Sequence, residues 1–176
     1  YAGLHESFVN LSEKADVLEH IKLVWASLWS DAAIAYSREL GLDAGKSMMS
    51  VIIQEMVCGE CSGVAFSVSP VDSEKAVIEA VPGLNKGLVD GDVEPDRWDL
   101  LRSSGEIAEF IRSKEKKETV PDQAGTRIIE FKGKNEPVLS VKKVRDIYSI
   151  MIDVEAKQNL PMDLDCTLKG GAIYLL

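Results

Sequence analysis

A chain of 176 residues, 45% of them apolar, is long enough to bury a hydrophobic core, which excludes an intrinsically disordered protein. Its 20 basic and 29 acidic residues are interspersed and give a formal charge of -9, so we expect no nucleic-acid partner. No apolar run reaches the roughly 20 residues needed to span a bilayer, and three cysteines fit a reducing compartment. We therefore expect a cytoplasmic protein without a membrane partner.

Helical periodicity marks the first part of the chain. Apolar positions recur every three or four residues over residues 17–29, which predicts an amphipathic helix whose two tryptophans lie in the core or against another part of the protein. Ser30 and Asp31 can cap a second helix over residues 32–40, which Gly41 would end.

Short runs rich in β-branched residues follow. Residues 47–57, 63–68 and 76–81 predict strands of an antiparallel meander. Residues 83–91 are rich in glycine and fit a loop or a short helix. The sequence after Pro95 is polar and irregular, and residues 113–119 carry a run of charges typical of a solvated surface segment.

The last part of the chain returns to regular patterns. Residues 138–157 predict a helix, and Gly170 with Gly171 predicts a turn into a last strand over residues 172–176. Helices and antiparallel strands are thus segregated, as in the α+β class. Because the chain begins with Tyr1 and breaks off within an apparent strand, we expect residues 1–176 to form a single domain that belongs to a longer protein.

Three groups of residues could carry chemistry. Cys58 and Cys61 could belong to a zinc or redox site, although they are predicted to lie in a simple connection between two strands. Asp163 and Asp165 alternate along an extended segment, so both could hold magnesium together with substrate phosphates, or could simply be exposed. Glu79 lies on an apolar strand and either points to solvent or accepts a hydrogen bond in a cleft, for example from a ribose hydroxyl.

A set of ordered motifs extends over nearly the whole chain. They are YAGLHES, VWASLWSDAAIAY, VIIQEMV, SGVAF, IEA, GLVDG, PDR, LPMDLD and GGAIYLL. Together they resemble the nucleotide-binding domain of phosphoenolpyruvate synthase (pyruvate, water dikinase) and pyruvate phosphate dikinase. The resemblance implies an ATP-grasp-like fold, with an antiparallel sheet and flanking helices, of which this chain would be the C-terminal portion. It also implies ATP and Mg²⁺ as cofactors, and transfer of phosphate from ATP to a histidine of a separate domain, then to pyruvate or another acceptor.

The same resemblance assigns residues to roles. By similarity Gln54, Glu55, Met56 and Val57 form the strand end and hinge that contacts adenine, and the segment from Cys58 to Cys61 is the turn leaving that hinge. Glu79 matches an acidic position near the nucleotide, and Asp163 and Asp165 match carboxylates that hold magnesium.

Two departures from the family pattern affect these assignments. The family has a glutamate where this chain has Asp165, and a further acidic residue where it has Lys86. The leading interpretation is the ATP-binding portion of a dikinase-type phosphotransferase. The alternatives are a non-catalytic ATP-sensing module with a degenerate site, and a zinc or redox module.

Overall fold

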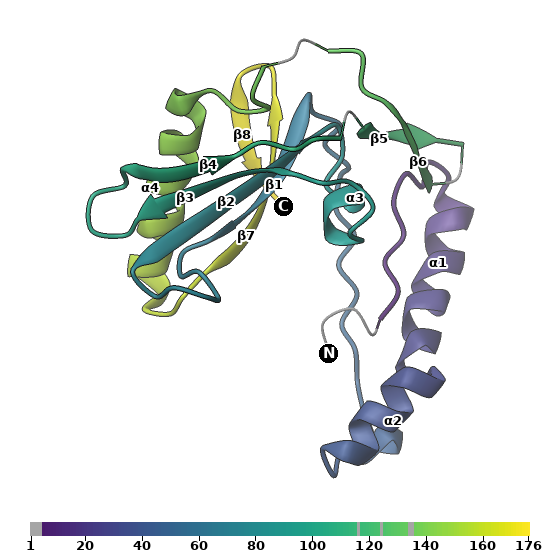
Figure 1. The fold of residues 1–176 in the computed structure, drawn as a ribbon. Helices are drawn as coiled ribbons and strands as arrows, with labels where there is room; N and C mark the ends of the chain where they lie inside the picture. Colours follow the sequence, from purple (N-terminus) through teal and green to yellow (C-terminus); the bar gives the residue numbers. More distant parts are fainter. Residues whose placement is uncertain (1–4, 116, 124, 134–135) are drawn as a thin grey trace. The chain divides into compact units, whose positions relative to one another are not determined.

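The computed structural model describes residues 5–115, 117–123, 125–133 and 136–176 (Figure 1). The chain separates into two compact units. The first, which we call the helical unit, comprises Tyr1–Met56 and Asp122–Gly125; the second, the sheet unit, comprises Val57–Pro121 and Thr126–Leu176. The single domain expected from the sequence stays a prediction.

The helical unit contains two α-helices and two short 3-10 helices, namely α1 (Lys14–Ala26), η1 (Ser27–Trp29), α2 (Asp31–Glu39) and η2 (Ala44–Lys46). The helix α1 begins three residues before the predicted start. Its first turn is polar and therefore lies outside the apolar pattern on which the prediction was based. The predicted capping of α2 is confirmed: the Oγ atom of Ser30 accepts a hydrogen bond from the backbone N–H of Ala33 at 3.2 Å. Gly41 follows with a φ of 68°, which glycine adopts without strain.

Trp25 and Trp29 are 47% and 53% exposed, so they do not lie in the core of the described structure, and their packing against another part of the protein stays a prediction. One sequence-based prediction for this unit is wrong. Residues 47–59 contain no strand. A β-rich sequence becomes a strand only when another backbone pairs with it, and in the described part of the chain no strand pairs with this segment, where Met48 is 95% and Ile52 85% exposed.

The sheet unit is built around six antiparallel strands in the order β4-β3-β2-β1-β7-β8 (Figure 1). These strands are β1 (Cys61–Phe66), β2 (Lys75–Pro82), β3 (Asp96–Leu101), β4 (Ile107–Ile111), β7 (Asp163–Lys169) and β8 (Ala172–Leu175). The short helix α3 (Lys86–Val89) follows β2, and α4 (Val141–Gln158) precedes β7. A separate two-stranded sheet pairs β5 (Lys117–Asp122) with β6 (Gly125–Glu130). The α+β class and the antiparallel sheet are therefore confirmed.

The sequence predicted some elements of the sheet unit and missed others. Strands β1 and β2, helix α4 and the hairpin of β7 and β8 lie close to the predicted ranges. The hairpin of β3 and β4, and the strands β5 and β6, were not predicted. Within β3 only residues 97–100, Arg-Trp-Asp-Leu, alternate between charged and apolar, and the charges of the strand conceal it although four of its six residues are buried.

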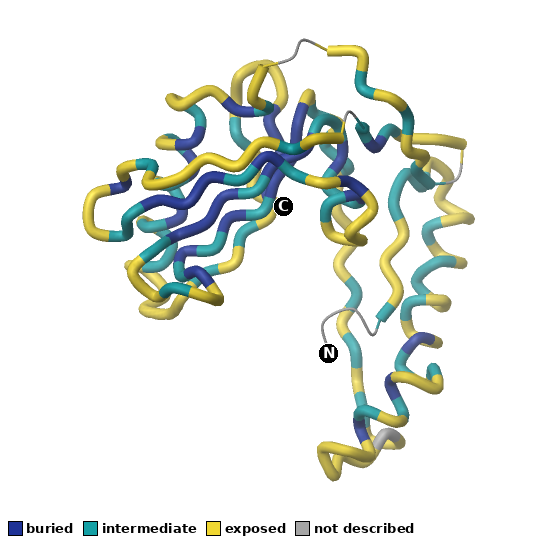
Figure 2. Tube along the Cα trace, viewed as in Figure 1, coloured by how far each residue is buried: buried dark blue, intermediate teal, exposed yellow. Residues whose placement is uncertain are grey.

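The core lies between α4 and one face of the sheet, whose strands carry most of the buried residues in Figure 2. From α4 it includes Val144, Ile147 and Met151, which recur at helical spacing. From the strands it includes Cys61, Ala65, Ala76, Ile78, Ala80, Trp98, Leu100, Cys166 and Leu168. These occupy alternate positions, so the intervening residues of each strand project to the opposite face.

Candidate functional site

The candidate site is the face of the six-stranded sheet opposite α4. Residues paired directly across antiparallel strands project to the same face. Glu79 is paired with Arg97 on one side and with Val64 on the other, and Val64 is paired with Asp165. The four residues form one row across β3, β2, β1 and β7, and three of them are charged.

Asp163 and Asp165 lie at alternate positions of β7, and both are exposed. Desolvation raises the pKa of Asp163, and the negative charge of Asp165 raises it further. The Nδ2 atom of Asn85 donates a hydrogen bond to Oδ1 of Asp165 at 2.5 Å. The amide oxygen of Asn85 is buried and, within the described structure, has no hydrogen-bond partner.

This donor set fits a magnesium ion that is bound together with phosphates. Magnesium prefers oxygen ligands and is typically held by one or two carboxylates plus substrate phosphates and water. Among the described residues, no group of three or more His, Cys, Asp or Glu side chains could hold a metal ion. A magnesium ion held by these two carboxylates would leave its other coordination positions to phosphates and water.

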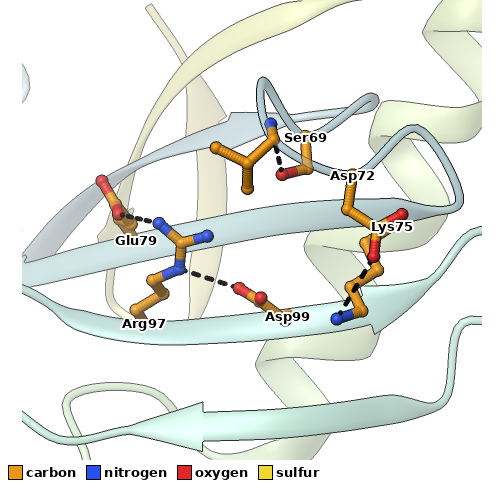
Figure 3. A network of polar contacts seen from close by, with 7 residues as sticks. Ser69, Asp72, Lys75, Glu79, Arg97 and Asp99 are labelled. Atoms are coloured by element: carbon orange, nitrogen blue, oxygen red, sulfur yellow. Dashed lines mark hydrogen bonds and ion pairs between the residues drawn. The ribbon is translucent and has the colours of Figure 1, made fainter.

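Glu79 belongs to a network of ion pairs on the same face (Figure 3). The Nη1 atom of Arg97 lies 3.3 Å from Oε1 of Glu79, and its Nε atom donates a hydrogen bond to Oδ1 of Asp99 at 2.8 Å. The side chains of Glu79, Arg97 and Asp99 are 23%, 30% and 11% exposed, so the network is partly shielded from water. The hydrogen bond from Arg97 to Asp99 is the main cause of a raised Arg97 pKa, so the guanidinium stays charged.

A hollow of about 440 Å³ adjoins Glu79. Its volume is in the range of small-molecule pockets. Its wall is formed by Glu79, Leu88, Gly91, Asp92, Val93, Glu94, Pro95 and Glu115. The wall therefore combines apolar surface with several carboxylates.

The residues expected to contact adenine lie outside regular secondary structure. Gln54, Glu55 and Met56 belong to the helical unit and Val57 to the sheet unit, and all four lie in the irregular segment 47–59. The strand end predicted for them is wrong, for the reason given above. Their contact with adenine stays a prediction.

The cysteines show no sign of chemistry. Cys58 is exposed in the irregular segment, whereas Cys61 begins β1, so the pair does not form the predicted connection between two strands. Cys61 and Cys166 are buried in the core, and desolvation raises their thiol pKa values to about 12 and about 11. Both thiols are therefore protonated at neutral pH, which disfavours a metal-binding or nucleophilic role.

Sequence reasoning missed three residues at or near the site. Asn85 contacts Asp165, Arg97 contacts Glu79, and Asp99 contacts Arg97, as described above. Lys86, left without a role, forms an ion pair with Asp90 one helical turn later, with Nζ and Oδ2 2.8 Å apart. The charged–apolar alternation of residues 97–100 was the one signal that could have revealed Arg97 and Asp99 as neighbours on a strand.

Family comparison supports a nucleotide-binding role. All of residues 1–176 match the family model described as "Pyruvate phosphate dikinase, AMP/ATP-binding domain". The chain belongs to this AMP/ATP-binding domain family. The family identified from the ordered motifs is thereby confirmed.

Similar proteins have names that agree with this assignment. The chain is 31% identical to a "Phosphoenolpyruvate synthase" of Aeropyrum pernix, over 94% of this chain and 24% of the relative. It is 28% identical to a "Probable phosphoenolpyruvate synthase" of Methanocaldococcus jannaschii, over 100% of this chain and 15% of the relative. A "Rifampicin phosphotransferase" of Streptomyces sviceus is 30% identical, over 100% of this chain and 21% of the relative. The chain spans about a quarter or less of the length of these relatives.

In the part of the chain that the structure describes, no helix is both long enough and apolar enough to cross a bilayer.

Proposed function

We propose that the chain is the ATP-binding portion of a dikinase-type phosphotransferase. The complete protein moves phosphate from ATP to a histidine of a separate domain and then to pyruvate or another acceptor, which an acceptor domain of the same protein binds. Relatives named for phosphoenolpyruvate synthesis and for rifampicin phosphorylation support the reaction class and leave the acceptor open. The cytoplasmic location expected from the composition stays a prediction.

The observation that carries this proposal is the exposed pair of Asp163 and Asp165 beside Asn85 on one sheet face. When bound there with ATP, magnesium would neutralise charge on the phosphates. The two aspartates orient the phosphate chain, and Asn85 holds one oxygen of Asp165 in place. The phosphoryl group is then positioned for in-line attack, which is most of what a protein contributes to phosphoryl transfer.

The remaining assignments complete the nucleotide site. Backbone groups of Gln54, Glu55 and Val57 hydrogen-bond the adenine edge, while Met56 covers an apolar face of the base. Glu79 accepts a hydrogen bond from the ribose. The antiparallel sheet with α4 on one face is consistent with the later, C-terminal portion of an ATP-grasp fold, in which the free face of the sheet meets the nucleotide.

A second candidate function is a non-catalytic ATP-sensing module. It is favoured by the side chain of Asp165, which is one methylene shorter than the family's glutamate, and by Lys86, which is paired with Asp90. A sensor binds ATP through the same face without transferring phosphate. Both functions therefore require ATP binding, and only the phosphotransferase transfers phosphate.

The decisive experiment incubates the full-length protein with magnesium and ATP labelled at the β-phosphate. A dikinase yields acid-labile label on a histidine outside this chain, together with AMP. The Asp165→Asn variant is the matched control, because it keeps the shape of the side chain and removes its charge. We expect label in the unmodified protein and none in the variant.

Two other results would change the conclusion. ATP binding without labelled histidine would support the sensing module. Absence of any ATP binding, measured by calorimetry on the same preparation, would contradict both candidate functions.

A further inference from the structure

The ion-pair network of Figure 3 holds Glu79 from one side only. Arg97 contacts Oε1 of Glu79, and within the described part of the chain no group donates a hydrogen bond to Oε2. Because Asp99 is 11% exposed and fixes the Nε atom of Arg97, it anchors the guanidinium in one orientation. The rotamer of Glu79 is thereby restricted, with one oxygen left for a ligand.

The hollow beside Glu79 is suited to an uncharged, hydroxyl-bearing group. Asp92 and Glu94 give its wall negative charge, which disfavours phosphates at this point, whereas Glu115 forms an ion pair with Lys117 at 3.1 Å. Leu88 and Val93 provide apolar surface for a ring. A sugar meets both requirements, because its hydroxyls donate hydrogen bonds to carboxylates while its carbon atoms pack against apolar side chains.

The position of Glu79 relative to the two aspartates also fits a sugar at Glu79. Glu79 and Asp165 are separated by one residue, Val64, in the row across the sheet. Two strand spacings amount to about 10 Å. An extended nucleotide can therefore place its metal-bound phosphates at β7 and its ribose at β2.

We propose that Arg97 and Asp99 are positioning residues that set recognition of the ribose hydroxyls through Glu79. This inference rests on the proposed function, because it takes ATP as the ligand. Arg97 does not touch the phosphates: it holds the carboxylate that accepts from the ribose. Nucleotides that lack these hydroxyls gain no binding affinity from the ion-pair network.

The test compares binding of Mg·ATP and Mg·2′,3′-dideoxyATP to the full-length protein by calorimetry, in the absence of an acceptor. Hydrogen bonds to a charged group predict that the unmodified protein prefers ATP by about ten- to a hundredfold. In Arg97→Met and in Glu79→Gln this preference should fall to about threefold or less. Arg97→Lys should lie between, because an ammonium cannot contact Glu79 and Asp99 with the fork of a guanidinium.

Lys75→Met is the matched control. Lys75 lies on the same strand, four residues from Glu79, and forms an ion pair with Asp72 at 3.3 Å. This variant also loses one cation from an ion pair on β2, yet it should keep the full preference for ATP. Asp99→Asn preserves the side-chain shape and provides a second test should Arg97→Met fail to fold; it too should lower the preference.

Three outcomes overturn the inference. If Arg97→Met and Asp99→Asn keep the full preference for ATP, Glu79 recognises the ribose without being positioned by Arg97 and Asp99. An equal loss of affinity for both nucleotides in Arg97→Met would place Arg97 on the phosphates. An unmodified protein that binds ATP without any preference would exclude ribose recognition by Glu79. If neither nucleotide binds to the unmodified protein, the proposed function itself fails.

Discussion

The two faces of the six-stranded sheet use adjacent residues of the same strands in opposite ways. On β2, Ala76, Ile78 and Ala80 are at most 1% exposed and pack in the α4 core, whereas Glu79 between them is 23% exposed and belongs to the polar network. On β7, Cys166 is buried while Asp165 next to it is exposed. Neighbouring residues thus belong to the core on one face and to the candidate site on the other, because successive side chains of a strand point to opposite faces.

The polar face contains both favourable and unfavourable pairs of charges. Glu79 lies directly opposite Arg97, of opposite sign, whereas Asp99 lies opposite Glu109, of the same sign, and is compensated by the hydrogen bond from Nε of Arg97. The aspartates of β7 form no ion pair with the described side chains, and desolvation together with the charge of Asp165 raises the pKa of Asp163. A cation bound by both carboxylates would reduce this repulsion.

The largest expected effect is on the polar face, at Asp165. Replacing it with alanine should lower magnesium-dependent phosphotransfer by the full-length protein by roughly a hundredfold or more, the scale of removing one preorganised charged group. Because Asp165 is exposed, the free energy of unfolding should change by less than about 0.5 kcal/mol. Turnover of labelled ATP and denaturant unfolding measure the two quantities.

Asp153, an exposed aspartate of α4, is the matched control. Asp153→Ala should leave turnover unchanged. Equal turnover in Asp165→Ala and Asp153→Ala would remove the role given to Asp165 and would break the division between the two faces.

The largest effect on stability is expected on the other face, at Ile78. Ile78→Ala should reduce the free energy of unfolding of the sheet unit by about 2–5 kcal/mol, because the side chain is fully buried and its removal leaves a cavity. Hydrogen exchange of the β1–β3 amides in the full-length protein measures the loss. The neighbouring Glu79→Ala should cost less; an equal or larger cost would mean that the polar network, too, serves mainly to stabilise the fold.

A medium effect, dependent on pH, is expected where β3 ends against α4. Arg102 lies 2.7 Å and 3.1 Å from the two carboxylate oxygens of Glu155, and Tyr148 donates a hydrogen bond to the Arg102 carbonyl at 2.8 Å. The hydrogen bond from Arg102 is the main cause of a lowered Glu155 pKa. Glu155→Gln should therefore lower the free energy of unfolding at pH 7 by about 1–3 kcal/mol.

The sign of the pH dependence follows from the lowered pKa. The stabilisation by Glu155 is present above the unfolded-state pKa of about 4.3 and is lost as the pH falls through the lower folded-state value. Urea unfolding at a series of pH values should show the difference between Glu155→Gln and the unmodified protein shrinking below about pH 4. A difference that is constant from pH 7 to pH 3 would mean that the charge of Glu155 does not contribute.

The smallest effect is expected at Cys58. Because this thiol is exposed, Cys58→Ser should change the free energy of unfolding by less than about 0.5 kcal/mol and leave phosphotransfer unchanged. Elemental analysis of both proteins should find no bound zinc. Zinc in the unmodified protein that is lost in Cys58→Ser would restore the metal-site interpretation.

Local sequence patterns correctly predicted elements that are formed by hydrogen bonds and turns between residues close in the sequence. Ser30 marks the start of α2, since its hydroxyl accepts a hydrogen bond from the backbone N–H of Ala33. The two glycines after β7 predicted the final hairpin. The strand predicted over residues 47–57 was wrong because a strand depends on a pairing partner that its own sequence does not specify.

The sequence by itself determined the α+β class, the family, and the carboxylates Asp163 and Asp165 as candidates, because periodicity, capping and motif order are properties of neighbouring residues. Only the tertiary structure placed Asn85 against Asp165, 80 positions away, and Arg97 against Glu79. Strand order and register decide such contacts, and they follow from how the whole sheet buries its apolar face on α4. The polar side chains that complete the site are brought together by this burial.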